Sequence, residues 1–343
     1  MRPRRNATEG TQARTLSGPL DVTVLMGGPS SERDISLLSG AAVADALDRT
    51  GHRVTRADIS PGDTSALDRR GIDVVFIALH GDFGESGQVQ ALCEARGLRY
   101  TGSGPRSSEL AMDKAASKQL LKQAGLATPD WMIIEEFHPP ALYKKWLEEI
   151  PPPLFLKPVD GGSSVDVIFA RSEEERDSAL ELLLDKYGRA MLERYVKGPE
   201  LTVSILGHEA LPVLEIRVAG DFYDYHAKYD DDAGTRYIFD HGLPDDTCRA
   251  VQADALKAHD SLGCRDMSRV DFILDSSGTP QVLEINTIPG FTSHSLLPMA
   301  AKRVGISFEQ LVNRLVEMAM SRPAPRANRP GKGKNVSRFE VER

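Results

Sequence analysis

Two neighbouring stretches near the C-terminal end place oxygen-bearing side chains on apolar segments. SRVDFIL contains Asp271, and VLEINT contains Glu284 and Asn286. Residues two apart on a strand share a face, so Glu284 and Asn286 point the same way, and a short turn at 276–278 makes the two strands neighbours. Two carboxylates and an amide oxygen suit Mg²⁺, which completes its shell with water and phosphate. Taken alone, the acids are equally well explained as solvent-exposed residues at strand ends.

Basic residues nearby could hold the phosphate that such an ion implies. Arg269 shares a face with Asp271, and an arginine on an apolar strand needs an anionic partner such as a phosphate or a developing oxyanion. Lys157 precedes a Gly-Gly-Ser-Ser loop whose backbone N–H groups can meet phosphate oxygens. This loop matches neither of the two common nucleotide fingerprints. Lys114 is a second candidate, although alone it reads as a surface lysine.

Further candidate residues lie in the first third of the chain and in one long polar segment. Glu32 follows Gly27 and Gly28 in the first turn of an expected helix, where it either complements the positive helix end or binds a substrate ammonium. His80 ends an expected strand, where α/β sheets bind ligands. YDYHAKYDDDAGTRYIF is a polar loop of the length typical of a lid.

These residues must be positioned by alternating strands and helices. The first third predicts a parallel sheet with ligands at the carboxyl ends of its strands. Its expected elements are strand 21–28, helix 30–51, strands 52–59 and 72–79, helix 86–97 and strand 98–102. The rest predicts two α+β units. Their expected elements are helix 112–126, two strands within 151–170, helix 172–188, strands 190–196, 200–207 and 210–218, helix 248–264, a hairpin over 267–287, and helices 293–305 and 307–321.

The composition describes an ordinary globular protein of two or three domains. The chain has 343 residues, of which 41% are hydrophobic and 27% charged. The net charge of −8 argues weakly against nucleic acid as the main partner. Three separated cysteines give no disulfide framework, and the sequence shows no secretory signal and no apolar run long enough for membrane insertion, so a cytoplasmic location is expected.

Eight stretches carry a family resemblance. In chain order they are GGPSSERDISLLSG, FIALHGDFGESGQVQ, YTGSG, MDK, LKPVDGGSSV, YDYHAKY, RVDFIL and LEINTIPGFTSHSLLPMA. From about residue 21 to 320 the chain therefore resembles the D-alanine–D-alanine ligases of the ATP-grasp superfamily.

The resemblance implies an α/β and α+β chain with a three-domain ATP-grasp fold and an N-terminal Rossmann-like parallel sheet. The expected divisions are a disordered tail 1–18, an N-terminal substrate domain 19–112, a central subdomain 113–200, a C-terminal subdomain 201–322 with a catalytic lid loop 221–245, and a disordered basic tail 323–343. The second tail reads either as an anion-binding arm or, in preference, as a solvated extension.

The implied reaction joins two D-alanine molecules through an acylphosphate, with ATP as co-substrate, for peptidoglycan precursor synthesis. It implies two Mg²⁺ or Mn²⁺ ions, a possible monovalent cation and a homodimer. The alternatives are a ligase that takes D-lactate or D-serine second, and a nucleotide-binding homologue without catalysis. The complete set of candidate ligands weighs against the last, and the hydroxyl of Tyr229 favours an amine nucleophile.

The resemblance also assigns roles to single residues. The metal ligands correspond to Asp271, Glu284 and Asn286, the phosphate contacts to Lys114, Lys157 and Lys228, and the adenine and ribose contacts to Glu193 and Glu200. The first substrate's site corresponds to Glu32 and His80, the oxyanion site to Arg269 and the Gly290 N–H, and the contact with the second substrate's carboxylate to Ser295. A triad that closes the lid corresponds to Ser163, Tyr229 and Glu32.

Three positions depart from the family pattern. The central loop commonly reads Glu-Gly-Ser-Ser-Val-Gly, whereas this chain has Gly161 at its start and Asp166 at its end. His226 stands where an acid is frequent. Asp166 would bring negative charge near phosphate unless its side chain turns away. These changes bear on kinetics and nucleotide affinity and leave the reaction class as expected.

Overall fold

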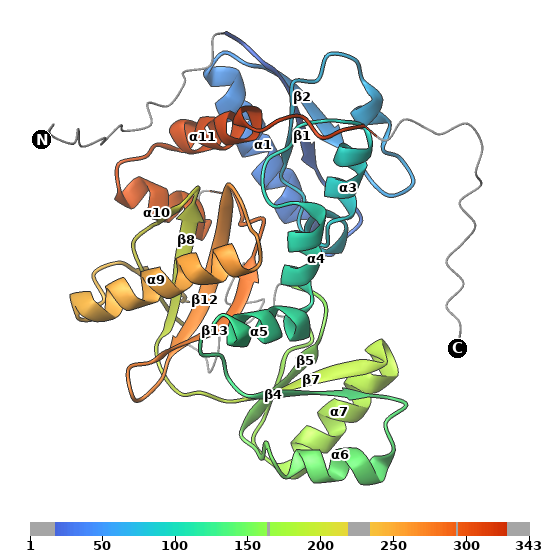
Figure 1. Cartoon of the computed structure of the whole chain (residues 1–343), viewed down its shortest axis with the longest axis vertical. Coiled ribbons are helices and arrows are strands. Elements are labelled where there is room, and N and C mark those ends of the chain that lie inside the picture. The colour runs from blue at the N-terminus through green and yellow to red at the C-terminus, as the bar shows by residue number, and fades with distance from the viewer. Residues whose placement is uncertain (1–17, 163–164, 219–233, 293, 328–343) are drawn as a thin grey trace, which may run out of the picture.

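Three sheets, arranged from one end of the molecule to the other, make up the protein (Figure 1). The computed structural model describes residues 18–162, 165–218, 234–292 and 294–327. The N-terminal sheet lies at one end beside the last helices, the C-terminal sheet lies in the middle, and a smaller central-region sheet lies at the other end.

The N-terminal sheet is parallel and has the strand order β2-β1-β3. Its strands are β1 (Asp21–Met26), β2 (Arg53–Asp58) and β3 (Val74–Ile77). The four residues of β3 are all apolar and buried, as expected for a strand covered on both faces. The other elements of this region are α1 (Arg33–Arg49), η1 (Ser65–Asp68), α2 (Asp82–Glu85), α3 (Gln88–Ala95) and α4 (Pro105–Met112). The expected strand 98–102 is reduced to one bridge between Val75 and Tyr100.

The second sheet is antiparallel, has the order β4-β7-β5-β6 and surrounds a core of its own. Its elements are β4 (Trp131–Glu135), α6 (Pro140–Leu147), β5 (Leu154–Pro158), β6 (Ile168–Ala170), α7 (Glu173–Tyr187) and β7 (Arg189–Arg194). Helix α7 begins where Ser172 accepts a hydrogen bond from the Glu175 N–H, and it ends at Gly188 in a left-handed conformation.

The third sheet has the order β11-β10-β8-β12-β13, with β9 paired to β8. Its elements are β8 (Glu200–Leu206), β9 (Glu209–Ala210), β10 (Leu214–Arg217), β11 (Arg236–Ile238), β12 (Met267–Leu274) and β13 (Pro280–Asn286), and the helices packed with it are α5 (Lys114–Gln123) and α9 (Asp245–Ser261). The expected hairpin is present as β12 and β13.

A β-bulge in this hairpin changes which side chains face outward. Asp271 pairs with Glu284 and Phe272 with Val282, so Leu283 is the extra residue. Leu283 and Glu284 are consequently both half-buried, whereas simple alternation would have buried one of them. The bulge therefore turns an apolar side chain and a carboxylate toward the same space.

The last helices, α10 (Leu296–Arg303) and α11 (Phe308–Ser321), complete the N-terminal core. The fully buried Phe291 packs its ring edge-on against Phe76 of β3, with the ring centroids 5.3 Å apart. The turn after β13 is thereby fixed to the N-terminal sheet. Since this sheet and the ends of β8 and β12 share one apolar cluster, the first and third sheets form a continuous body.

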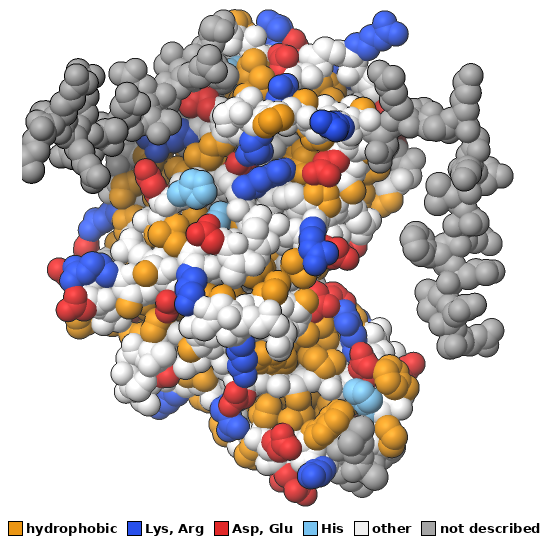
Figure 2. Space-filling model, viewed as in Figure 1, with side chains coloured by type: hydrophobic (Ala, Val, Ile, Leu, Met, Phe, Trp, Pro, Cys, Tyr) orange, Lys and Arg blue, Asp and Glu red, His pale blue; other side chains and the backbone are white. Residues whose placement is uncertain are grey.

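Part of the expected lid lies outside the described residues. Within the range 221–245, the structure describes residues from 234 onward. Of these, Arg236–Ile238 form β11 and Asp245 already begins α9, so the expected loop is too long at its C-terminal end. Within the described ranges no helix has the length and apolar character needed to cross a membrane. On the face shown in Figure 2, acidic and basic side chains are interspersed.

Candidate active site

Two adjoining cavities lie where the three regions meet. The first, of about 410 Å³, is bounded by the second and third sheets. The second, of about 550 Å³, is bounded by α1, the end of β13 and the start of α10. Lys114, Gly161, Gly162 and Glu284 line both cavities. A reactant in one cavity can therefore meet a reactant in the other beside Lys114 and Glu284.

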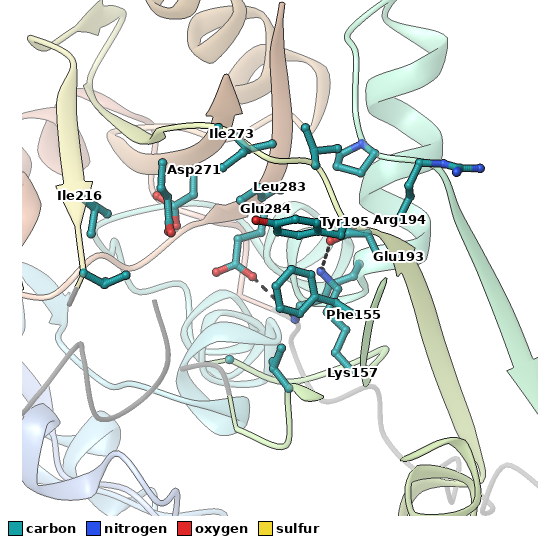
Figure 3. Close-up of a pocket in the computed structure, with 18 of the residues that line it drawn as sticks. Phe155, Lys157, Glu193, Arg194, Tyr195, Ile216, Asp271, Ile273, Leu283 and Glu284 are labelled. Carbon is teal, nitrogen blue, oxygen red and sulfur yellow. Dashed lines mark hydrogen bonds and ion pairs between the residues drawn. The ribbon is translucent and has the colours of Figure 1, made fainter. Parts of the chain in front are cut away.

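The first cavity is lined by both apolar and charged side chains. Phe155 and Tyr195 contribute aromatic rings from the central-region sheet, and Ile273 and Leu283 contribute aliphatic side chains from the hairpin (Figure 3). Lys157, Glu193 and Glu284 lie among these apolar side chains (Figure 3). A ligand with a planar apolar part and a charged part suits such a lining.

The candidate metal ligands share one face of the hairpin. Asp271 and Glu284 are direct register partners, and Asn286 follows two residues after Glu284. Asn286 Oδ1 accepts a hydrogen bond from the Ile288 N–H at 2.8 Å, which orients this oxygen and leaves it a second lone pair. Among the described residues no group of three or more His, Cys, Asp and Glu side chains could hold a metal ion. The candidate ligand set therefore depends on the amide oxygen of Asn286.

Asp271 is held in place by two neighbours. The Thr202 hydroxyl donates to its Oδ1 at 2.7 Å. Arg269 donates from Nε to Oδ1 at 2.9 Å and from Nη2 to Oδ2 at 2.7 Å. Such a two-point contact fixes both side chains. Arg269 also lines the second cavity, so the hairpin presents a guanidinium beside the carboxylates.

Lys157 belongs to a buried ionic cluster that includes a residue missed by sequence reasoning. Its Nζ donates to Glu193 Oε1 at 2.7 Å (Figure 3). The other oxygen, Glu193 Oε2, lies 2.5 Å from Nζ of Lys118, whose side chain is 0% exposed. Lys118 also donates to the Thr128 hydroxyl. One signal could have found it: Lys118 lies four residues after Lys114 and hence on the same face of α5.

Lys114 lies at the junction of the cavities. It donates to the carbonyl oxygen of Gly161, and its Nζ lies 3.9 Å from Glu284 Oε2. It also follows Asp113, whose side chain caps α5 by accepting from the Ala116 N–H. The start of α5 thus fixes Lys114 beneath the glycine-rich loop.

The second cavity has an acidic wall. Glu32 precedes α1, is 8% exposed and makes no side-chain capping bond. His80 Nδ1 lies 3.6 Å from Glu85 Oε1, and burial raises the pKa of Glu85 despite this contact. The Ser39 hydroxyl accepts from the Phe291 N–H at 3.2 Å and lies 3.2 Å from His80 Nε2. Sequence reasoning identified Glu32 and His80 and missed Glu85 and Ser39.

Gly290 needs its lack of a side chain. A Cβ there would lie 2.5 Å from Ser295 Oγ, which is closer than side chains pack. Ser295 in turn accepts from the Thr292 N–H at 2.9 Å and precedes α10. The turn therefore holds a backbone segment and a hydroxyl side by side on the wall of the second cavity.

All predicted site residues that the structure describes line one of the two cavities. Lys157, Glu193, Glu200 and Asp271 line the first, Glu32, His80, Arg269, Asn286, Gly290 and Ser295 the second, and Lys114 and Glu284 both. Ser163, Lys228, Tyr229 and the departure His226 lie outside the described residues. Asp166 lines neither cavity.

Comparisons with known proteins identify the family of this chain. The chain matches two family models, "D-ala D-ala ligase N-terminus" over residues 55–103 and "D-ala D-ala ligase C-terminus" over residues 120–317. It is 42% identical over 310 residues to a D-alanine–D-alanine ligase of Pelotomaculum thermopropionicum, covering 88% of this chain and 97% of that protein. It is 44% identical over 298 residues to one of Nitrosospira multiformis, covering 87% and 96%.

Solved structures give the same result. The D-alanine–D-alanine ligase of Bacillus anthracis complexed with ATP superposes with a TM-score of 0.77 at 34% identity, covering 89% of this chain and 98% of that one. The VanG D-Ala:D-Ser ligase of Enterococcus faecalis superposes with a TM-score of 0.78 at 28% identity, covering 88% and 99%.

Proposed function

The chain belongs to the D-alanine–D-alanine ligase family and is an ATP-dependent ligase, and from that premise we propose which residues perform each part of the reaction. The reaction joins two D-alanine molecules into the dipeptide used for peptidoglycan precursors. The observation that carries the assignment is the distribution of the predicted site residues over two cavities that meet at Lys114 and Glu284.

The first cavity takes ATP. The adenine lies between the aromatic and aliphatic side chains that line this cavity, with Glu193 and Glu200 toward the nucleoside. The phosphates extend toward Lys157 and Lys114, whose positive charges neutralise them. Phosphoryl transfer depends mainly on such positioning and charge neutralisation, and the protein need not form a covalent bond to the substrate. Lys228 is proposed for the γ-phosphate from the resemblance alone.

The second cavity takes both D-alanine molecules. Glu32, with His80 close by, binds the ammonium of the first D-alanine. The carboxylate of this D-alanine attacks the γ-phosphate of ATP to form an acylphosphate, and ADP is released. The amine of the second attacks the acyl carbon, and phosphate leaves. Arg269 and the Gly290 N–H stabilise the tetrahedral oxyanion, where one such donor contributes about 3 kcal/mol in acyl transfer. Ser295 binds the second carboxylate.

Divalent ions belong to the proposal as well. Asp271, Glu284 and Asn286 would hold two Mg²⁺ or Mn²⁺ ions, since their hard oxygen atoms share one face of the hairpin and border both cavities. When bound, these ions neutralise phosphate charge. A monovalent cation remains part of the proposal through the resemblance only. Ser163 and Tyr229, which would close the lid with Glu32, have the same basis.

Phosphate release tests the assignment directly. Purified protein with ATP and Mg²⁺ is given D-alanine, D-alanine with D-lactate, D-alanine with D-serine, or no amino acid. We expect phosphate and D-alanyl-D-alanine in equal amounts with D-alanine alone. A mixed product in preference to the dipeptide would reassign the second substrate. No phosphate release in any mixture would leave a nucleotide-binding protein without this catalysis.

Location and assembly complete the proposal. We propose a cytoplasmic enzyme, because the three cysteines are free and ATP is the co-substrate. A homodimer is proposed from the resemblance. Light scattering of the purified chain, which has a mass of 37.5 kDa, distinguishes a dimer from a monomer.

A further inference from the structure

The buried cluster of Lys118, Glu193 and Lys157 contains one more positive charge than negative. Glu193 lies between the lysines, with Lys157 2.7 Å from one carboxylate oxygen and Lys118 2.5 Å from the other. Lys118 is 0% exposed, and neither cavity is lined by it. Burying an ammonium group is costly unless a partner compensates, so its place behind Glu193 needs an explanation.

The two lysines of the cluster differ in what they can reach. Lys157 lines the first cavity beside Lys114, where the proposed function places phosphate. Lys118 contacts Glu193 and the Thr128 hydroxyl and lies 5.6 Å from the ring centre of Trp131. It therefore has no path to the nucleotide, whereas Lys157 can turn from Glu193 toward a phosphate.

The charge states agree with this division. Burial on its own raises the pKa of Glu193, but Lys118 and Lys157 outweigh it and hold that pKa below the ordinary carboxyl value. Burial lowers the pKa of Lys118 to about 8, although Glu193 opposes the shift. With both lysines beside it, the Glu193 carboxylate is therefore favoured in its ionised form.

We propose that Lys118 is a positioning residue that holds the buried Glu193 carboxylate in place, so that Lys157 can exchange this carboxylate for a phosphate of the nucleotide. Without Lys118, transfer of Lys157 to phosphate would leave a buried carboxylate without a counter-ion, and Lys157 would stay on Glu193. The inference rests on the proposed function, because it takes the anion in the first cavity to be ATP.

The test compares Lys118→Met with Lys122→Met. Lys122 lies one turn further along α5 and 4.6 Å from the ring centre of Trp131, but its side chain is 46% exposed and pairs with Asp130. We expect Lys118→Met to raise the KM for ATP at least tenfold with the KM for D-alanine changed less than twofold. Lys122→Met should leave both values within twofold. Equal KM values for ATP in Lys118→Met and the unsubstituted protein would overturn the proposal.

A double-mutant cycle separates positioning from packing. If Lys118 acts through the charge of Glu193, Lys118→Met should weaken ATP binding far less in a Glu193→Gln background than in the unsubstituted one. Equal losses in both backgrounds would overturn the proposal, since Glu193→Gln keeps the size of the side chain and removes its charge. Should Lys118→Met not fold, Lys118→Gln keeps a hydrogen-bond donor without the charge and undergoes the same comparison.

Binding of ATP measured by calorimetry without D-alanine keeps this test separate from the proposed function. Weaker binding in Lys118→Met supports the positioning role even if the unsubstituted protein forms no dipeptide. Unchanged binding overturns the positioning role even if the unsubstituted protein forms the dipeptide at full rate.

Discussion

At the scale of single residues, Asp166 brings a negative charge close to the proposed phosphate site, where it would repel phosphate. Its backbone has a φ of 55°, a left-handed conformation that favours glycine, which the family commonly has there. Its carboxylate accepts hydrogen bonds from Lys186 and the Tyr187 hydroxyl at the end of α7, and these contacts lower its pKa. The side chain is therefore directed to α7, and the charge lies outside both cavities.

Glu284 is a proposed metal ligand, and it lies 3.9 Å from Lys114, a proposed phosphate contact. We predict that Glu284→Gln lowers Mg²⁺-dependent turnover by at least two orders of magnitude, because one oxygen ligand and one negative charge are lost beside Lys114. Steady-state phosphate release over a Mg²⁺ titration measures the effect. The thermal unfolding midpoint should stay within a few degrees, since the side chain is half-buried. Unchanged turnover would remove Glu284 from the metal site.

Single site residues were predictable from sequence where side-chain type and strand position decide the outcome. Glu284 and Asn286 share a face because they are two apart on β13, and Asp271 joins them through a short turn. Lys118 was not predicted as a site residue, because a lysine on a helix usually faces solvent. Its contacts with Glu193 and Thr128 depend on the burial of its side chain on the inner face of α5.

At the scale of elements, a crossing of two backbones joins the central-region sheet to the hairpin. Gly198 lies between β7 and β8, and a Cβ there would lie 1.8 Å from the carbonyl oxygen of Leu274 at the end of β12. The same glycine lines the first cavity. The connection between these sheets is therefore shaped by the close approach of two main chains.

We predict that Gly198→Ala lowers the free energy of unfolding by about 3 kcal/mol, because backbone atoms must move apart to admit the methyl group. Urea unfolding measures the loss, and the KM for ATP should rise as the cavity wall shifts. Gly62→Ala is the matched control: its Cβ would meet only Ser60 Oγ at 3.9 Å, so stability should change by less than about 0.5 kcal/mol. Equal stability of the two variants would contradict the prediction.

Most elements follow from local patterns, and the exceptions have identifiable causes. Helix α7 carries its own start and stop signals in Ser172 and Gly188. Strand β4 and helix α6 were not expected, because a short apolar run and a proline-rich start resemble a loop. The bulge at Leu283 depends on pairing between β12 and β13, which periodicity within one strand does not reveal.

At the scale of the whole molecule, the C-terminal end of the chain packs against the N-terminal sheet. Helix α11 packs on the N-terminal sheet, Arg49 of α1 pairs with Glu309 of α11 at 2.8 Å, and Phe291 enters the same core. The central-region sheet has a separate core. The second cavity is thus built mainly on the larger body, whereas the first is bounded by the second and third sheets. The resemblance implied three domains, but pattern alone did not show that the first and third share a core.

A buried histidine links the stability of the C-terminal region to pH. His259 on α9 is 0% exposed, and its Nδ1 lies 2.7 Å from the Ser268 hydroxyl at the start of β12. Burial lowers the pKa of His259 to about 4 from an ordinary value of 6.5, with Asp260 opposing the shift and His208 adding to it. The folded state therefore disfavours the imidazolium form, and the unfolded state binds the proton first as the pH falls.

The contribution of His259 to stability is fully present above about pH 6.5 and is lost progressively as the pH falls toward 4. The full loss is about 3 kcal/mol, the free energy of a shift of this size. We predict that His259→Gln flattens the decline in unfolding free energy between pH 6.5 and 4, because glutamine can still bond Ser268 and takes up no proton. Urea unfolding at intervals of half a pH unit measures the slope. A decline equally steep in His259→Gln and in the unsubstituted protein would assign the acid sensitivity to other groups.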